Sequence, residues 1–151
     1  MLIRVTPDVL QTDEAIASVA SAGAGAINVF LGVVRNNNLG RTVSYLEYDA
    51  YPAMAEKVMR ELAEEARERF GLEAAAVLHR TGRLEIGEAS LLVAVSCGHR
   101  AESFEATHWL VNEIKKKVPV WKKEVWEDGE EWIEGPESMG IQQAPAGMRG
   151  S

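Results

Sequence analysis

The sequence has a single cysteine, Cys97, among 151 residues, which excludes an internal disulfide. It also lacks any apolar run close to the roughly 20 residues that a helix needs to cross a bilayer. The opening residues, MLIRVTPDVLQTDE, become acidic too soon for the long apolar region of a signal peptide. These absences predict a cytoplasmic protein.

Positive charge is also scarce. The chain has 16 Lys and Arg residues against 23 Asp and Glu residues, a formal net charge of -7. Because phosphate polymers attract basic surfaces, this balance disfavours general nucleic-acid binding. The few cations are nevertheless concentrated, since five lysines lie within the segment KKKVPVWKK, residues 115–123. Any anion site must therefore be local.

Several signatures of catalysis are missing. The histidines, His79, His99 and His108, lack the paired spacing of metal ligands. No Gly-rich loop ends in Lys-Ser/Thr, and no serine occupies a nucleophile elbow. Cys97 ends an apolar segment, which is more typical of core packing than of a reactive thiol, although its position beside Gly98 would also suit sulfur chemistry.

No repeat or linker divides the chain, so we expect one domain over residues 1–140 and a disordered tail over residues 141–151. The clearest helix runs from Pro52 to Phe70 and ends at Gly71. Its expected apolar stripe has a spacing of four and consists of Met54, Val58, Leu62, Ala66 and Phe70. A short helix opens at residues 12–14 and closes at Gly23, and a long one covers residues 101–117.

Strands are predicted at residues 2–6, 26–34, 42–48, 74–79, 89–96, 120–126 and 131–133, with another in the segment RLEIGE. The strand at 26–34 is expected to be buried, and NNNLG, residues 36–40, is expected to be a turn or loop. This order lacks the regular alternation of a doubly wound fold. It indicates an α+β fold with a mainly antiparallel or mixed sheet and about three helices.

The lysine segment has two interpretations. On a helical wheel Lys115 lies at the edge of the apolar arc of residues 104–114, whereas Lys116 lies clear of it. In an extended strand after Pro119, Lys122 and Lys123 face opposite sides. A tight corner at the proline could bring Lys115 and Lys122 to one pocket. Alternatively, these lysines only complement the helix dipole and remain solvated.

Two further basic groups are candidates for anion binding. His99 and Arg100 follow an apolar strand and precede a helix, a junction whose backbone N–H groups favour anions. A structural role for His99 at the helix entry is equally consistent with the sequence. Arg35 ends the strand AINVFLGVV, which is a weak signal on its own.

These segments together resemble one family. FLGVVRNNNLG, LEYDAYPAMAEK, HRTGRLEIGE, SCGHR followed by SFEA, and KKKVPVWKKE occur in that order between Asp13 and Ser138. The chain resembles the large, catalytic subunit family of molybdopterin synthase. The resemblance implies an α/β-hammerhead type of α+β fold. It also implies a sulfurtransferase of molybdenum cofactor biosynthesis that converts cyclic pyranopterin monophosphate (precursor Z) to molybdopterin.

In this family, sulfur arrives as a thiocarboxylate on the C-terminal Gly-Gly of a small ubiquitin-like subunit. The resemblance implies a homodimer within a heterotetramer, and neither a metal nor a cofactor. It implies that Lys115 and Lys122 are catalytic and that the substrate is bound by Arg35, His99, Arg100, Val33, Val34, Lys123 and Glu124. Gly135-Pro136 departs from the family, whose members have a basic residue there.

Two alternatives remain open. One is a non-catalytic module that binds anions or nucleic acid through the lysine run, although the net charge of -7 opposes it. The other is a sulfur carrier that uses Cys97.

Overall fold

The computed structural model describes residues 1–134, and the predicted disordered tail and Gly135-Pro136 lie outside this range. The elements are β1 (Leu2–Thr6), α1 (Thr12–Val19), β2 (Ala26–Val33), β3 (Asn37–Asn38), β4 (Arg41–Ala50), α2 (Pro52–Phe70), β5 (Ala74–Arg80), β6 (Gly82–Glu85), β7 (Ala89–Cys97), α3 (Arg100–Lys117), β8 (Val120–Trp126) and β9 (Gly129–Glu134). These elements confirm the predicted α+β class, and the described residues contain three α-helices. None of these helices is long and apolar enough to cross a membrane.

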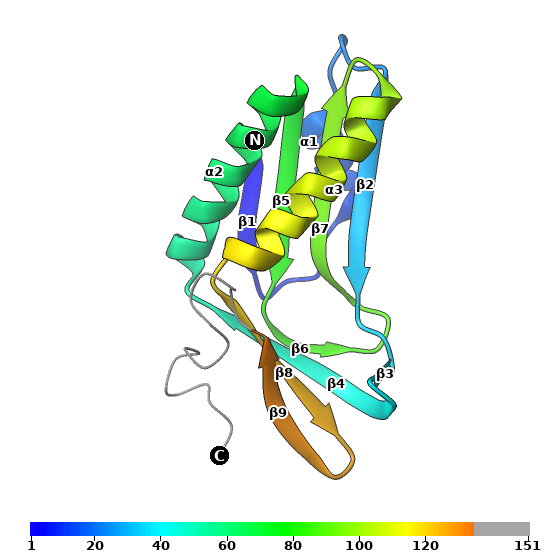
Figure 1. Cartoon of the computed structure of the whole chain (residues 1–151), viewed down its shortest axis with the longest axis vertical. Coiled ribbons are helices and arrows are strands. Elements are labelled where there is room, and N and C mark those ends of the chain that lie inside the picture. Colours follow the sequence, from blue (N-terminus) through cyan, green and yellow to red (C-terminus); the bar gives the residue numbers. More distant parts are fainter. Residues whose placement is uncertain (135–151) are drawn as a thin grey trace.

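The first sheet has the strand order β1-β5-β7-β2. β1 and β5 are parallel, and the other neighbours are antiparallel. Helices α2 and α3 cover one face of this sheet and α1 covers the other (Figure 1). The central strand β7 is buried along nearly its whole length because both of its faces are covered.

The second sheet has the order β3-β4-β8-β9, and β6 also pairs with β4. Its strand pairs are antiparallel. It lies at the end of the first sheet where α2 begins and α3 ends (Figure 1). Val118 and Pro119, both buried, form the corner between α3 and β8. This corner places the end of α3, which covers the first sheet, next to β8 of the second sheet.

Helix α2 begins and ends where the sequence predicts. Pro52 is its first residue, and Gly71 follows it in the left-handed conformation with φ 66°. The predicted stripe is only partly correct, because Met54 is 50% exposed whereas the buried residues are Ala55, Met59, Leu62, Ala63 and Ala66. A strict spacing of four drifts by about 40° per step around a helix with 3.6 residues per turn. The buried face therefore mixes steps of three and four.

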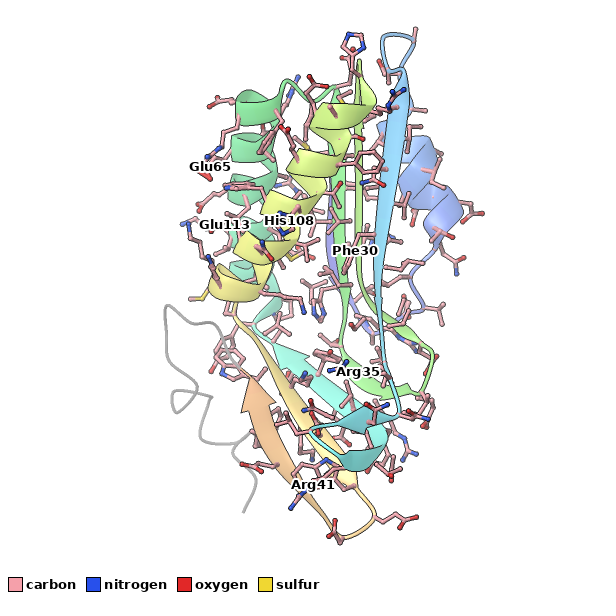
Figure 2. The ribbon with its side chains drawn as sticks, turned by 45° about the vertical axis from the view of Figure 1, so that its right-hand side comes forward. Phe30, Arg35, Arg41, Glu65, His108 and Glu113 are labelled. Carbon is pink, nitrogen blue, oxygen red and sulfur yellow. The ribbon has the colours of Figure 1, made fainter. Side chains whose placement is uncertain are left out.

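The prediction of a buried strand at residues 26–34 is wrong for one side of β2. This strand is the edge of the first sheet, and Ile27, Leu31 and Val33 are 43%, 41% and 55% exposed. Phe30 points the other way, toward α3, and packs against the core (Figure 2). Only the order of the strands decides which strand is the edge, so the composition of the segment did not reveal it.

Three smaller predictions also differ from the structure. Helix α1 ends at Val19 rather than at Gly23. Phe104, placed in the apolar arc of α3, is 60% exposed, whereas Ser103 and Thr107 are buried. These two hydroxyls can be buried because each donates a hydrogen bond to a helix carbonyl, that of Arg100 and that of Ser103, at 2.6 and 2.8 Å. The segment NNNLG, predicted to be a turn or loop, contains the turn of the β3–β4 hairpin but also the short strand β3, so this prediction is only partly correct.

Candidate active site

A cavity of about 300 Å³ lies where the two sheets meet the end of α3. Its lining residues come from β2 and the segment after it, β3, β4, β7, α3 and β8: Gly32, Val33, Val34, Arg35, Asn37, Asn38, Val43, Leu46, Tyr48, Ser90, Lys115, Lys122 and Glu124. Six of these residues were predicted from the sequence as site residues: Val33, Val34, Arg35, Lys115, Lys122 and Glu124.

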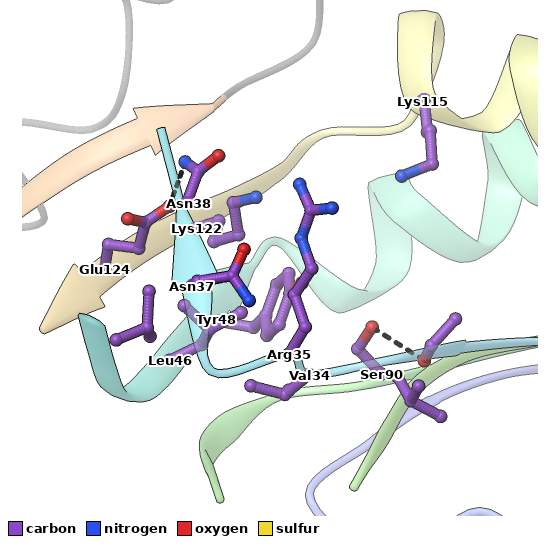
Figure 3. Close-up of a pocket in the computed structure, with 13 residues that line it drawn as sticks. Val34, Arg35, Asn37, Asn38, Leu46, Tyr48, Ser90, Lys115, Lys122 and Glu124 are labelled. Carbon is purple, nitrogen blue, oxygen red and sulfur yellow. Dashed lines mark hydrogen bonds between the residues drawn. The ribbon is translucent and has the colours of Figure 1, made fainter. Parts of the chain in front are cut away.

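The cavity brings together three cationic side chains that are distant in sequence. Lys115 comes from the last turn of α3 and Lys122 from β8, on either side of the buried Val118-Pro119 corner. Figure 3 shows the Arg35 guanidinium between the two lysine side chains in that view. Lys115 and Arg35 are exposed, so the cavity is open to solvent. Such a group of cations suits an anionic ligand.

Arg35 is held in place by the backbone before it. The pairing of β2 with β7 shifts register between Gly32 and Val33, because Gly32 lies opposite Leu91 and Val33 opposite Ala89, which leaves Ser90 of β7 as the extra residue. The N–H of Val34 then donates to the carbonyl of Glu88 at 2.9 Å, and its carbonyl accepts from the N–H of Gly87 at 2.7 Å. The residue before Arg35 is thus fixed at both polar backbone groups, while the Arg35 side chain leaves the sheet.

Glu124 supplies an acidic group in the same cavity, and it is only 2% exposed. The side-chain amide of Asn38 donates to its Oε2 at 2.7 Å, and the indole N–H of Trp126 donates to its Oε1 at 2.8 Å. Both carboxyl oxygens of Glu124 therefore have a neutral donor, as a buried polar group requires.

Lys123 points to the other side of the second sheet. Its Nζ lies 2.9 Å from a carboxyl oxygen of Glu47 and 3.4 Å from one of Glu130. The hydrogen bond with Glu47 is the main cause that raises the pKa of Lys123. The Lys123 side chain lines a different hollow, shared with Glu47 and Trp132, and does not line the cavity of Lys115 and Lys122.

His99 and Arg100 lie at the opposite end of α3 from Lys115. His99 is the residue before the helix and Arg100 is its first residue. At a rise of about 1.5 Å per residue, the 15 positions from Arg100 to Lys115 span about 22 Å along the helix axis. Within one chain, these two predicted substrate contacts are therefore too distant to reach a ligand that lies between Lys115 and Lys122.

Cys97 is 1% exposed and belongs to the main hydrophobic core. Its thiol lies 2.9 Å from the carbonyl of His99 in donor geometry. Burial raises the pKa of the Cys97 thiol, which disfavours the nucleophilic thiolate.

His79 is also buried, with its ring against Tyr48 and Nδ1 at 2.8 Å from the carbonyl of Arg80. Among residues 1–134, no group of three or more His, Cys, Asp or Glu side chains could hold a metal ion.

Comparison with known proteins identifies the family. The family model described as MoaE protein matches residues 5–117. This chain belongs to the MoaE family. A relative in Pyrococcus abyssi named molybdopterin synthase catalytic subunit is 49% identical over 137 residues, which cover 91% of this chain and 93% of the relative.

A human relative with the same name is 41% identical over 131 residues, which cover 87% of this chain and 70% of the relative. The crystal structure of molybdopterin synthase from Staphylococcus aureus superposes with a TM-score of 0.84 and 36% identity. That match covers 87% of this chain and 96% of the other. Membership of the MoaE family therefore agrees with the fold as well as with the sequence.

Sequence reasoning missed four polar residues in the cavity of this MoaE-family chain: Asn37, Asn38, Tyr48 and Ser90. Asn38 was seen only as part of an Asn-rich turn, and Tyr48 only as an alternating strand residue. The alternation of β4 does place Leu46 and Tyr48 on one side, as the cavity requires. Which side faces the lysines depends on the pairing of β4 with β8, which a single sequence does not reveal.

Proposed function

We propose that this chain is the catalytic subunit of a molybdopterin synthase, a sulfurtransferase that converts cyclic pyranopterin monophosphate to molybdopterin. The observation that carries the proposal is the convergence of Arg35, Lys115 and Lys122 on one cavity in a chain of the MoaE family. The names of the relatives, which call them catalytic subunits, support the presence of a second subunit. We propose that this second subunit carries the sulfur. The cytoplasmic location stays a prediction.

The charges of the cavity suit the proposed reaction. The substrate carries a cyclic phosphate, and the tail of the small subunit ends in an anionic thiocarboxylate. Two anions meet in one site, so cations must be gathered there to offset their repulsion. Lys115 and Lys122 also supply positive charge to the oxyanion that forms at the acyl carbon when its bond to sulfur breaks. Arg35 offers a planar donor fork for the phosphate.

For His99 and Arg100 we propose that they complete the cavity of a second copy of the chain. β2 is a sheet edge without a charged residue, and three of its apolar side chains are exposed: Ile27, Leu31 and Val33. Such an edge favours pairing with another strand. A two-fold axis beside the free edge of β2, perpendicular to the sheet, would pair it antiparallel with the β2 of a second copy.

This pairing would join the two separated parts of the site. Ala26, at one end of β2, lies opposite Cys97, two residues before His99. Val33, at the other end, lines the cavity. In an antiparallel β2 pair each Ala26 end lies beside the partner's Val33 end, so His99 and Arg100 of one copy would approach the cavity of the other.

Reconstitution tests the activity. The purified chain is mixed with a thiocarboxylated small subunit and precursor Z, and molybdopterin is followed as its fluorescent oxidation product. We expect product that depends on both the chain and the thiocarboxylate. Absence of product, with the thiocarboxylate verified by mass spectrometry, would overturn the proposed function.

Mixed dimers test the shared site. Chains with Lys115→Ala and chains with Arg100→Ala, carrying different tags, are co-expressed, and the heterodimer is purified on both tags. If each site takes Lys115 from one chain and Arg100 from the other, one site is intact and activity recovers to about half of the wild-type value. If both residues serve the site of a single chain, the heterodimer has no more activity than the two homodimeric variants.

The alternative of a module that binds phosphate polymers gains no support. The five lysines do not form one basic face, because Lys123 pairs with two carboxylates and Lys117 pairs with Glu113 at 3.2 Å. Lys115 and Lys122 line a cavity instead.

A further inference from the structure

A tight turn, residues 85–88, carries the chain from β6 in the second sheet to β7 in the first. The N–H of Glu88 donates to the carbonyl of Glu85 at 3.0 Å, and Gly87, the third residue of the turn, has φ 89°. This is the arrangement of a type II turn, whose third position favours glycine. The turn therefore lies where the chain passes between the two sheets, and the cavity lies where the same two sheets meet.

The side chain of Glu88 closes this turn a second time. Its Oε1 accepts a hydrogen bond from the backbone N–H of Glu85 at 2.8 Å, and its Oε2 accepts one from Nη1 of Arg80 at 2.9 Å. Nε of Arg80 in turn donates to the carbonyl of Pro7 at 3.0 Å. The Arg80 side chain is only 15% exposed, so this ion pair is better shielded from solvent than most surface pairs. The carboxyl group thus ties the turn to the end of β5 and to the segment after β1.

The same turn holds the residue that precedes Arg35. The carbonyl of Val34 accepts from the N–H of Gly87 at 2.7 Å, and the N–H of Val34 donates to the carbonyl of Glu88 at 2.9 Å. Val34 is also 3% exposed, and its side chain belongs to a small core cluster with Val43, Leu46 and Leu84. The turn therefore supplies both backbone partners of a residue whose side chain is already packed.

The Arg35 side chain takes its position from this backbone. It lines the cavity together with Lys115 and Lys122 (Figure 3). Among residues 1–134, no group forms a hydrogen bond or an ion pair with the Arg35 guanidinium. An arginine binds a phosphate best when its planar fork makes two parallel hydrogen bonds, which requires the correct direction of approach. Val34 sets that direction, because it fixes the backbone from which the side chain leaves.

We propose that Glu88 is a positioning residue of the cavity, whose carboxyl group, held by Arg80, fixes the turn that places Arg35 for binding of the substrate phosphate. Glu88 does not itself line the cavity, so it acts through the backbone of Val34 and not by contact with the substrate. This inference rests on the proposed function, because it concerns the binding of that substrate.

Steady-state kinetics of the reconstituted complex test this role. In the variant Glu88→Ala the turn loses its tie to Arg80, so Arg35 should hold the phosphate less well in the ground state and in the transition state alike. We therefore expect KM for precursor Z to rise about tenfold while kcat changes less than about threefold. A smaller fraction of folded protein would instead lower kcat and leave KM unchanged. Glu88→Gln keeps the size and one acceptor oxygen, so it should raise KM by about threefold, and it replaces the alanine variant if that variant does not fold.

Glu85→Ala is the matched control. Oε1 of Glu85 accepts from Nε of Arg83 at 2.7 Å, so this variant also loses an ion pair from the same turn, but it keeps the backbone N–H that Glu88 binds. The Glu85 side chain does not line the cavity, and KM should stay within about twofold of the wild-type value. A KM for the folded Glu88 variant no higher than that of this control would overturn the proposal.

A double-mutant cycle decides whether Glu88 acts through Arg35. In a chain with Arg35→Ala there is no guanidinium to position, so adding the Glu88 substitution should change KM by less than about twofold. An undiminished effect in that background would also overturn the proposal. If the proposed function itself is wrong, the wild-type complex makes no product, which is distinguishable from a KM that does not respond to Glu88.

Discussion

Lys122 and Lys123 are consecutive residues of β8 whose side chains lie on opposite sides of the second sheet. Lys122 lines the cavity with Lys115, whereas Lys123 forms ion pairs with Glu47 and Glu130 on the other side. Glu47 is the residue directly opposite Lys123 in β4. Because a slip of one residue would exchange the two faces of the strand, this cross-strand pair favours the register that directs Lys122 into the cavity.

Lys123→Gln should therefore affect the fold more than the chemistry. We expect the free energy of unfolding to fall by about 1 kcal/mol, because two ion pairs are lost, one of them directly cross-strand. Turnover should remain above about half of the wild-type rate. Urea unfolding and the reconstituted assay measure the two quantities. A variant with unchanged stability and a large loss of turnover would instead make Lys123 a substrate contact.

Cys97→Ala should leave sulfur transfer intact. The thiol is buried in the core, and burial raises its pKa, so it is poorly suited to carry a persulfide. The substitution leaves a small cavity and should cost about 1 kcal/mol of stability. The reconstituted assay, run well below the melting temperature, decides the point. Loss of product formation by a folded Cys97→Ala variant would support the sulfur-carrier alternative.

Leu39→Asn should stabilise the chain. Leu39 has φ 51° and is 95% exposed, so a leucine occupies a left-handed position without burying its side chain. Asparagine adopts this conformation more readily and precedes glycine in the favoured form of this turn. We expect a gain of about 1 kcal/mol in the free energy of unfolding. Leu39→Ala is the control, since it removes the exposed apolar group without improving the turn. Equal stability of the two variants would contradict the explanation.

Glu88 should contribute to acid sensitivity. The backbone N–H of Glu85, and next the Arg80 guanidinium, hold the pKa of Glu88 below its usual range. Since the folded-state pKa is the lower one, the stabilisation is complete above the unfolded value of about 4.3 and is lost as the pH falls through the folded value. Wild type should therefore be more stable than Glu88→Gln at pH 7, and the difference should shrink below about pH 4. Urea unfolding at several pH values measures it. A difference that does not change with pH would contradict this assignment.

Much of the local structure could be predicted from the sequence because local signals specify it. Pro52 and Gly71 bound α2, and Pro119 follows the end of α3. Strand alternation alone also predicts that the side chains of Lys122 and Lys123 lie on opposite sides of the sheet. Burial was harder to predict. The exposure of Ile27 depends on which strand is the sheet edge, and that is decided by pairings between segments distant in sequence.

In the candidate site, too, the features set by local sequence were easier to predict than those set by contacts between distant segments. The proline corner made it possible for the two central lysines to share a pocket, but spacing alone left this open, and it was predicted only from the resemblance to the family. The separation of His99 from Lys115 follows from the length of α3, which the sequence also predicts, but the significance of that distance is visible only once the cavity is located. Asn38 was missed since its partner, Glu124, is distant in sequence and belongs to another strand.

Single-turnover sulfur transfer in the reconstituted complex tests the central claim most directly, with Lys115→Ala and Lys122→Ala compared against Lys116→Ala. Lys116 is an exposed neighbour that does not line the cavity, so its variant controls for loss of a lysine from the same helix end. We predict that the two cavity variants transfer sulfur at least about 100-fold more slowly while remaining folded, and that Lys116→Ala keeps the wild-type rate. Transfer by Lys115→Ala or Lys122→Ala as fast as by Lys116→Ala would contradict the account.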